Sequence, residues 1–272
     1  MADKRAVGVF DSGLGGLTVV KELRRVLPNE DIVYFGDTGR VPYGTRSSDT
    51  IRKYAIEDEN FLLKQNVKLI IAACGTVSSV AGDTAKDLPV PFFEVVSHSA
   101  KAAVKVTKNK KIGVIGTAAT IKSGKHKEEI LKLMPQISVK SQSCSLFVPL
   151  VEEGWFDADD IVVLETVKRY LQPIIDFGAD TIILGCTHYP VLSDAIKKAV
   201  GKDVTLINAG NDTALAVAEH LQKTGLVNDD SHIGKQTFFV SDKADSFRNL
   251  ASILLGQEID DDYVKQVELG SL

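Results

Sequence analysis

The sequence predicts an α/β protein of two pseudo-symmetric lobes, each built on a doubly wound parallel sheet, with the active site in the cleft between them. Short apolar runs alternate with helical segments along almost the whole chain, an order typical of parallel sheets. One pattern occurs twice, because residues 68–76 and 180–188 each contain an apolar run, a cysteine and then a small or polar residue. Residues 112–117 also resemble residues 7–12, which supports an internal duplication.

The elements are predicted from periodicity and from their flanking residues. Apolar runs predict strands over residues 6–10, 31–35, 68–74, 90–96, 111–116, 137–141, 181–186, 205–207 and 237–240. Helical spacing predicts helices over residues 17–27, 47–64, 97–107, 161–177, 211–221 and 244–255. Ser47 or Ser48 is expected to be the N-cap of the second helix, and the helix over residues 161–177 must accommodate Pro173.

The segment after about residue 210 has too few strands to form a lobe of its own. We therefore expect it to return to the first lobe, which comprises residues 1–97 and 211–272, while residues 98–210 form the second lobe. In this division Asp11 and Cys74 belong to the first lobe, and Cys186 and His188 belong to the second.

Composition excludes several classes of function. The chain of 272 residues has a hydrophobic fraction of 44% and a formal net charge of −4, which gives no electrostatic reason to expect nucleic acid or an anionic membrane as a partner. No apolar run approaches the roughly 18–20 residues of a membrane span. Three cysteines do not make a disulfide framework, and the N-terminus leads directly into a predicted strand, so we expect a cytoplasmic protein without a secretory signal.

Cys74 and Cys186 each stand at the carboxyl end of a predicted buried strand and precede a helix. Open α/β sheets bind ligands at this edge, and a helix N-terminus favours a thiolate. A redox pair would usually have Cys-x-x-Cys spacing, and a zinc site would need a Cys/His cluster; neither is present, so no metal is expected. Two buried apolar cysteines remain an alternative, and Cys144, which lacks this setting, is interpreted as structural.

Two thiols that face one cleft are suited to moving a proton from one face of a carbon to the other. One thiolate removes the proton while the opposite thiol returns another. A thiol with an ordinary pKa near ~8.5 can act as either group after modest tuning.

Five motifs occur in order along the chain: Asp11-Ser12-Gly13-Leu14-Gly15-Gly16, Tyr34-Phe35-Gly36-Asp37-Thr38, Pro42-Tyr43-Gly44, Val148-Pro149-Leu150-Val151-Glu152-Glu153-Gly154 and Cys186-Thr187-His188-Tyr189-Pro190. Together they resemble the glutamate racemase family of cofactor-independent amino-acid racemases. The resemblance extends from about residue 6 to about residue 255.

The resemblance implies a glutamate racemase that needs no cofactor, forms a homodimer and supplies D-glutamate for peptidoglycan. Cys74 would take the α-proton from D-glutamate and Cys186 from L-glutamate, assisted by Asp11 and His188. Glu152 is a further candidate. The resemblance to the family also implies a set of substrate-binding residues. They are Asp11, Ser12, Pro42, Tyr43, Gly44, Gly75, Thr76, Thr117, Thr120, Thr187 and His188. As alternative roles, Asp11 could be a helix N-cap, His188 a core residue and Tyr43 a loop-packing residue.

Gly75 departs from the family, which usually has asparagine after the first cysteine to hold the substrate's amino group. We expect this contact to be lost, or moved to water or the backbone, and Gly75→Asn to keep activity.

Two alternative functions remain. One is a racemase of aspartate or another amino acid, and the other is a two-lobed ligand-binding protein without activity. A nicotinamide-dependent enzyme is disfavoured because the glycine spacing does not fit Gly-x-Gly-x-x-Gly.

Overall fold

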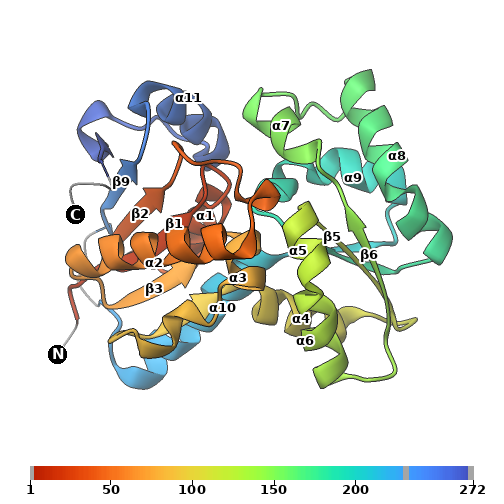
Figure 1. Ribbon diagram of the computed structural model, residues 1–272, viewed down its shortest axis with the longest axis horizontal. Coiled ribbons are helices and arrows are strands. Elements are labelled where there is room, and N and C mark those ends of the chain that lie inside the picture. Colours follow the sequence, from red (N-terminus) through yellow and green to blue (C-terminus); the bar gives the residue numbers. More distant parts are fainter. Residues whose placement is uncertain (1–2, 229–232, 269–272) are drawn as a thin grey trace.

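The computed structural model describes residues 3–228 and 233–268 and has two lobes that lie side by side (Figure 1). Each lobe contains a parallel sheet with helices on both faces, so the predicted fold class is confirmed. Both ends of the described chain lie on the lobe that contains the first strand (Figure 1).

Four strands of the first sheet have the same order as the four strands of the second. The first has the order β10-β9-β2-β1-β3-β4 and the second the order β6-β5-β7-β8, and the pairings within both sheets are parallel. The strands of the first sheet are β1 (Val7–Asp11), β2 (Ile32–Gly36), β3 (Leu69–Ala72), β4 (Phe92–Glu94), β9 (Gln236–Val240) and β10 (Val264–Gln266). Those of the second are β5 (Lys111–Gly116), β6 (Ser138–Ser143), β7 (Thr181–Leu184) and β8 (Thr205–Asn208). The order β2-β1-β3-β4 matches β6-β5-β7-β8, as an internal duplication requires.

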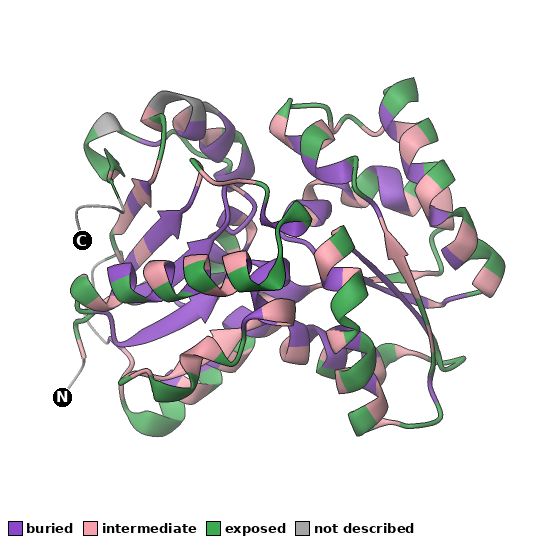
Figure 2. Ribbon diagram, in the orientation of Figure 1, coloured by how far each residue is buried: buried purple, intermediate pink, exposed green. Residues whose placement is uncertain are grey.

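Apolar side chains cover both faces of each sheet, and strands β1, β3 and β7 are buried along their whole length (Figure 2). The helices of the first sheet are α1 (Leu17–Val26), α2 (Ser48–Lys64), α3 (Gly75–Val80), α10 (Ala209–Thr224) and α11 (Ala244–Leu255). Those around the second are α4 (Val95–Val106), α5 (Ala118–Ser123), α6 (Lys125–Leu133), α7 (Phe147–Glu152), α8 (Ile161–Phe177) and α9 (Ser193–Val200). Helices α1, α10 and α11 share one core with the first sheet, and α2 shares another on the opposite face. Helices α4 and α6 pack on one face of the second sheet, and α7, α8 and α9 pack on the other.

The segment after residue 210 rejoins the first sheet, where β9 pairs with β2 along its whole length. The predicted boundary between residues 97 and 98 falls within α4. The division of the chain into residues 1–97 with 211–272 and residues 98–210 stays a prediction, and residues 1–2, 229–232 and 269–272 lie outside the described part.

Several predicted boundaries need correction. The strand predicted over residues 90–96 ends at Glu94, because this carboxylate caps α4 by accepting hydrogen bonds from the N–H groups of Val96 (2.6 Å) and Ser97 (2.9 Å). The two cysteine strands end two residues before their cysteines, at Ala72 and Leu184. The helix predicted from residue 211 begins at residue 209, since the side chain of Asn208 caps it.

Other boundaries agree with the prediction. Strand β5 and helices α8 and α11 have the predicted bounds, and α8 continues through Pro173. Ser47 is the N-cap of α2, and its hydroxyl accepts a hydrogen bond from the N–H of Thr50. Helices α5, α6, α7 and α9 were not predicted. Within the described ranges, no helix combines the length and apolarity needed to cross a membrane.

Candidate active site

Cys74 lies between β3 and α3, at the N-cap position of the short helix. Its thiol is buried, and its Sγ lies 3.6 Å from Oγ of Ser12, which follows the neighbouring strand β1. The parallel order of β1 and β3 places their carboxyl ends together, so Ser12 and Cys74 meet at one edge of the first sheet.

Cys186 has the equivalent place in the second sheet, two residues after β7. Its Sγ lies 3.8 Å from Nδ1 of His188, and Nε2 of that ring lies 3.2 Å from Oε1 of Glu152 at the end of α7. The His188 side chain is buried, whereas the Glu152 side chain is 30% exposed. The imidazole therefore links the second thiol to a carboxylate that reaches solvent.

Asp11 ends β1 and is fully buried. Its Oδ2 accepts hydrogen bonds from the N–H groups of Gly13 (3.2 Å) and Gly16 (3.1 Å), so it holds the turn before α1, whose N-cap is Gly16. Its Oδ1 accepts a hydrogen bond from the hydroxyl of Thr187 (3.3 Å) in the second lobe. The carboxylate thus combines a role in the turn with a contact across the cleft.

Burial makes the charges around the two thiols unequal. Burial and the nearby Asp11 raise the pKa of Cys74 to about 12. Burial also raises the pKa of Asp11, although the positive charge of His188 opposes this shift. For His188, burial alone lowers the pKa, but the contacts with Cys186 and Glu152 outweigh burial and raise the pKa to about 10. At neutral pH Cys74 is a thiol, and Cys186 lies beside the positively charged imidazolium of His188.

The two lobes are in close contact at this point. A Cβ atom on Gly75 would lie 2.3 Å from the carbonyl oxygen of Gly185 and 3.6 Å from Cα of Cys186. The cavity that Cys186 lines has a volume of about 10 Å³, which is about the space of one water-sized probe. An amino acid does not fit in it, so the lobes have to separate before a substrate can reach the thiols.

A chain of hydroxyl groups joins the two lobes near the start of α3. Thr76 Oγ1 is 3.0 Å from Thr117 Oγ1 of the other lobe, and Thr117 Oγ1 is 3.0 Å from Thr120 Oγ1. Gly44 lies against Thr117, because a Cβ atom on Gly44 would be 2.6 Å from the Cβ of that threonine. Four of the predicted substrate-binding residues therefore lie together, on both sides of the cleft.

The other predicted residues have different surroundings. The Tyr43 hydroxyl is hydrogen-bonded to the buried carboxylates of Asp37 and Asp58, so its phenol anchors the loop. Pro42 is exposed and follows a cis peptide bond. Cys144 is buried in the core of the second lobe.

Some contacts at the site were not predicted. The hydroxyl of Thr18 lies 3.2 Å from the carbonyl oxygen of Thr187, and His126 and Gly185 line the small cavity beside Cys186. Gly185 directly precedes the second cysteine and could have been found from that position, whereas nothing in the sequence singled out Thr18 or His126. Across residues 3–228 and 233–268, no group of three or more His, Cys, Asp or Glu side chains could hold a metal ion.

Comparison with known proteins identifies the family. The Asp/Glu/Hydantoin racemase family profile matches residues 15–217. The chain belongs to the Asp/Glu/Hydantoin racemase family. Within this racemase family, it is 41% identical to a glutamate racemase of Geobacter metallireducens, with 97% of each chain covered. It is 44% identical to a glutamate racemase of Sulfurihydrogenibium sp., with 98% of each covered.

A solved racemase has the same fold. The crystal structure of glutamate racemase from Francisella tularensis in complex with D-glutamate matches with a TM-score of 0.91 and 38% identity, over 99% of this chain and 100% of the other. The resemblance to the glutamate racemases that the five motifs predicted is therefore confirmed.

The contact at Gly75 changes the expectation for Gly75→Asn. The new Cβ would overlap a backbone oxygen of the other lobe, and backbone cannot rotate away as a side chain can. We predict that Gly75→Asn holds the lobes apart and lowers kcat/KM by about tenfold or more, an effect of about 1.4 kcal/mol. Steady-state racemisation kinetics test this, with Gly82→Asn on the exposed surface as the control. Wild-type kinetics in Gly75→Asn would show that the contact has no role in turnover.

The raised pKa of His188 predicts a pH-dependent contribution to stability. Since the folded pKa of about 10 exceeds the ordinary value of 6.5, this contribution is complete below about pH 6.5 and is lost as pH rises toward 10. The stability deficit of His188→Gln should therefore shrink between pH 6 and 10, by at most about 1.4 kcal/mol per pH unit. Denaturant unfolding at a series of pH values measures it.

His126→Gln is the matched control between about pH 8 and 10, because burial lowers the pKa of His126 to about 4 and this range also lies above its ordinary value of 6.5. The ring is then neutral in both the folded and the unfolded state, so the deficit of His126→Gln should not change with pH there. A deficit of His188→Gln that is equally independent of pH would contradict the assigned charge of His188.

Proposed function

We propose that this protein interconverts L-glutamate and D-glutamate, with Cys74 and Cys186 acting on opposite faces of the α-carbon. The observation that carries the proposal is the placement of the thiols. They follow β3 and β7, which are equivalent strands in the order that the two sheets share, and the strand ends meet at Gly75 and Gly185.

The reaction is a proton exchange and needs no oxidant or reductant. A thiolate takes the α-proton, so the C–H bond breaks and its electron pair passes to the α-carbon and the adjacent carboxylate. The opposite thiol then gives its proton to the other face of the α-carbon and becomes a thiolate. Charge and protons balance after one turnover, with the two sulfurs in exchanged protonation states.

Each direction of the reaction starts from a different protonation state of the two sulfurs. In the free protein Cys74 is a thiol at neutral pH, and His188 carries a positive charge beside Cys186. L-glutamate needs Cys186 as the thiolate and Cys74 as the thiol, and D-glutamate needs the reverse. In this proposal Asp11, whose charge acts on Cys74, and His188, in contact with Cys186, accept and donate the protons that reset the pair.

Glutamate is favoured over aspartate because the relatives named glutamate racemase cover nearly the whole chain at 41% and 44% identity. The hydroxyl groups of Thr76, Thr117 and Thr120 at the cleft can donate hydrogen bonds to carboxylates.

We further propose that the protein acts in the cytoplasm as a homodimer and supplies D-glutamate for peptidoglycan.

Circular dichroism of the purified protein with each enantiomer tests the activity. We predict loss of optical activity from L- and D-glutamate, with far slower reaction of L- and D-aspartate. The rate should survive dialysis against a chelator and treatment with hydroxylamine, which removes pyridoxal phosphate. Cys74→Ser and Cys186→Ser should each lose about 10²–10⁴-fold in rate, the range for removing a general acid or base.

Cys144→Ser is the control for loss of a buried thiol outside the site and should keep most of the activity. Full racemisation by either Cys74→Ser or Cys186→Ser would contradict the two-thiol proposal. Binding of glutamate without any racemisation by the folded wild-type protein would favour the two-lobed ligand-binding protein instead.

A further inference from the structure

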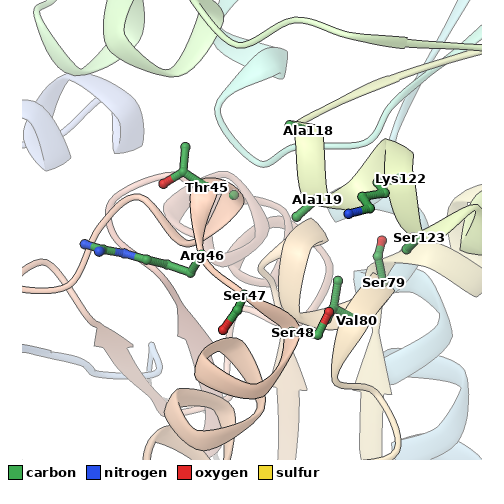
Figure 3. A pocket seen from close by; sticks show the side chains of 11 residues that line it. Thr45, Arg46, Ser47, Ser48, Ser79, Val80, Ala118, Ala119, Lys122 and Ser123 are labelled. Atoms are coloured by element: carbon green, nitrogen blue, oxygen red, sulfur yellow. The ribbon is translucent and has the colours of Figure 1, made fainter.

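A second cavity between the lobes lies outside the closed site. It has a volume of about 520 Å³ and is lined by residues 44–48 and the end of α3 from the first lobe, and by α5 from the second (Figure 3). We call it the entrance pocket. Because both lobes contribute to its walls, its shape depends on how far the lobes are separated.

The entrance pocket borders the contact that closes the cleft. Gly44 is part of its wall and lies against Thr117, whose hydroxyl is 3.0 Å from that of Thr76. Thr76 is two residues from Cys74, in the first turn of α3. Separation of Gly44 and Thr76 from Thr117 would therefore open a route from the entrance pocket toward the first thiol.

The charge and polarity of the entrance pocket suit a carboxylate. Figure 3 shows the amine of Lys122 directed into the pocket, whereas the side chain of Arg46 extends away. Among the described residues Lys122 forms no ion pair, and the Ser79 hydroxyl in the pocket wall, whose oxygen is shielded from solvent, has no hydrogen-bond partner. The pocket is lined by no aspartate or glutamate, although the chain carries a net charge of −4.

We propose that the entrance pocket is an outer docking site, in which the exposed amine of Lys122 holds a carboxylate of glutamate before the lobes separate. This proposal rests on the proposed function, because it takes glutamate as the substrate. Docking raises the concentration of the anionic substrate beside the closed cleft, and such an effect acts on the rate of association more than on the chemical step. Lys122 is a binding residue in this scheme and takes no part in proton transfer.

Racemisation kinetics of Lys122→Gln test the docking site. At low ionic strength we expect kcat/KM to fall by about 3–10-fold with kcat nearly unchanged, because electrostatic steering commonly contributes about tenfold or more. The loss should fade at about 1 M salt, where the screening length is only about 3 Å. Lys122→Arg should keep most of the wild-type value.

Lys127→Gln is the matched control, because Lys127 is an exposed lysine of the nearby helix α6 and lies outside the pocket. It removes the same charge and should leave kcat/KM unchanged.

The two directions of the reaction provide an internal check. L- and D-glutamate have equal free energies, so any change in kcat/KM must be the same in both directions. An unchanged kcat/KM in Lys122→Gln, or an equal loss in Lys127→Gln, would overturn the docking site.

Glutarate, a dicarboxylate without an amino group, separates this proposal from the proposed function. Calorimetric titration should show weaker glutarate binding to Lys122→Gln than to wild type and to Lys127→Gln, whether or not the protein racemises glutamate. Equal binding by all three proteins would overturn the docking site. Absence of glutamate racemisation by the wild type would instead contradict the proposed function.

Discussion

The two sheets meet through their strand ends, with Gly75 of one lobe against the carbonyl oxygen of Gly185 in the other. The remaining features of the site depend on this contact. It brings the segments that carry Cys74 and Cys186 together, and it leaves a cavity of only about 10 Å³ beside the second thiol. A side chain at position 75 would hold the lobes farther apart, so glycine there sets how completely the cleft closes.

Closure also determines the electrostatics. Asp11 accepts a hydrogen bond from Thr187 across the cleft, and the charge of His188 acts on Asp11 from the other lobe. Because water is excluded, the Cys74 thiol beside the carboxylate is held protonated, while the imidazolium of His188 places a positive charge beside Cys186. The two sites thus differ in charge, and the proposed mechanism needs one base and one acid at any moment.

The sequence was informative where local pattern determines structure. Apolar runs placed β5 and both cysteine strands, and helical spacing placed α8 despite Pro173. Helix α6 was missed because only His126 and Ile130 of its residues are buried, which leaves a weak apolar pattern in a charged segment. The five motifs predicted the family.

Contacts between distant segments could not be predicted. The hydrogen bond of Asp11 with Thr187 and the overlap that a side chain at Gly75 would make with Gly185 join residues of different lobes. They depend on the angle between the two sheets, which no local pattern encodes. For this reason the sequence predicted that Gly75→Asn would be tolerated, whereas the backbone of the other lobe leaves no space for it.

The assignment of one thiol to each face is tested most directly with β-chloro-glutamate, from which loss of chloride requires only the first deprotonation. The account predicts that Cys186→Ser eliminates chloride from the D-configured analogue and fails on the L-configured one, and that Cys74→Ser shows the reverse. Equal residual elimination from both analogues by either folded variant would show that one base reaches both faces, and would contradict the account.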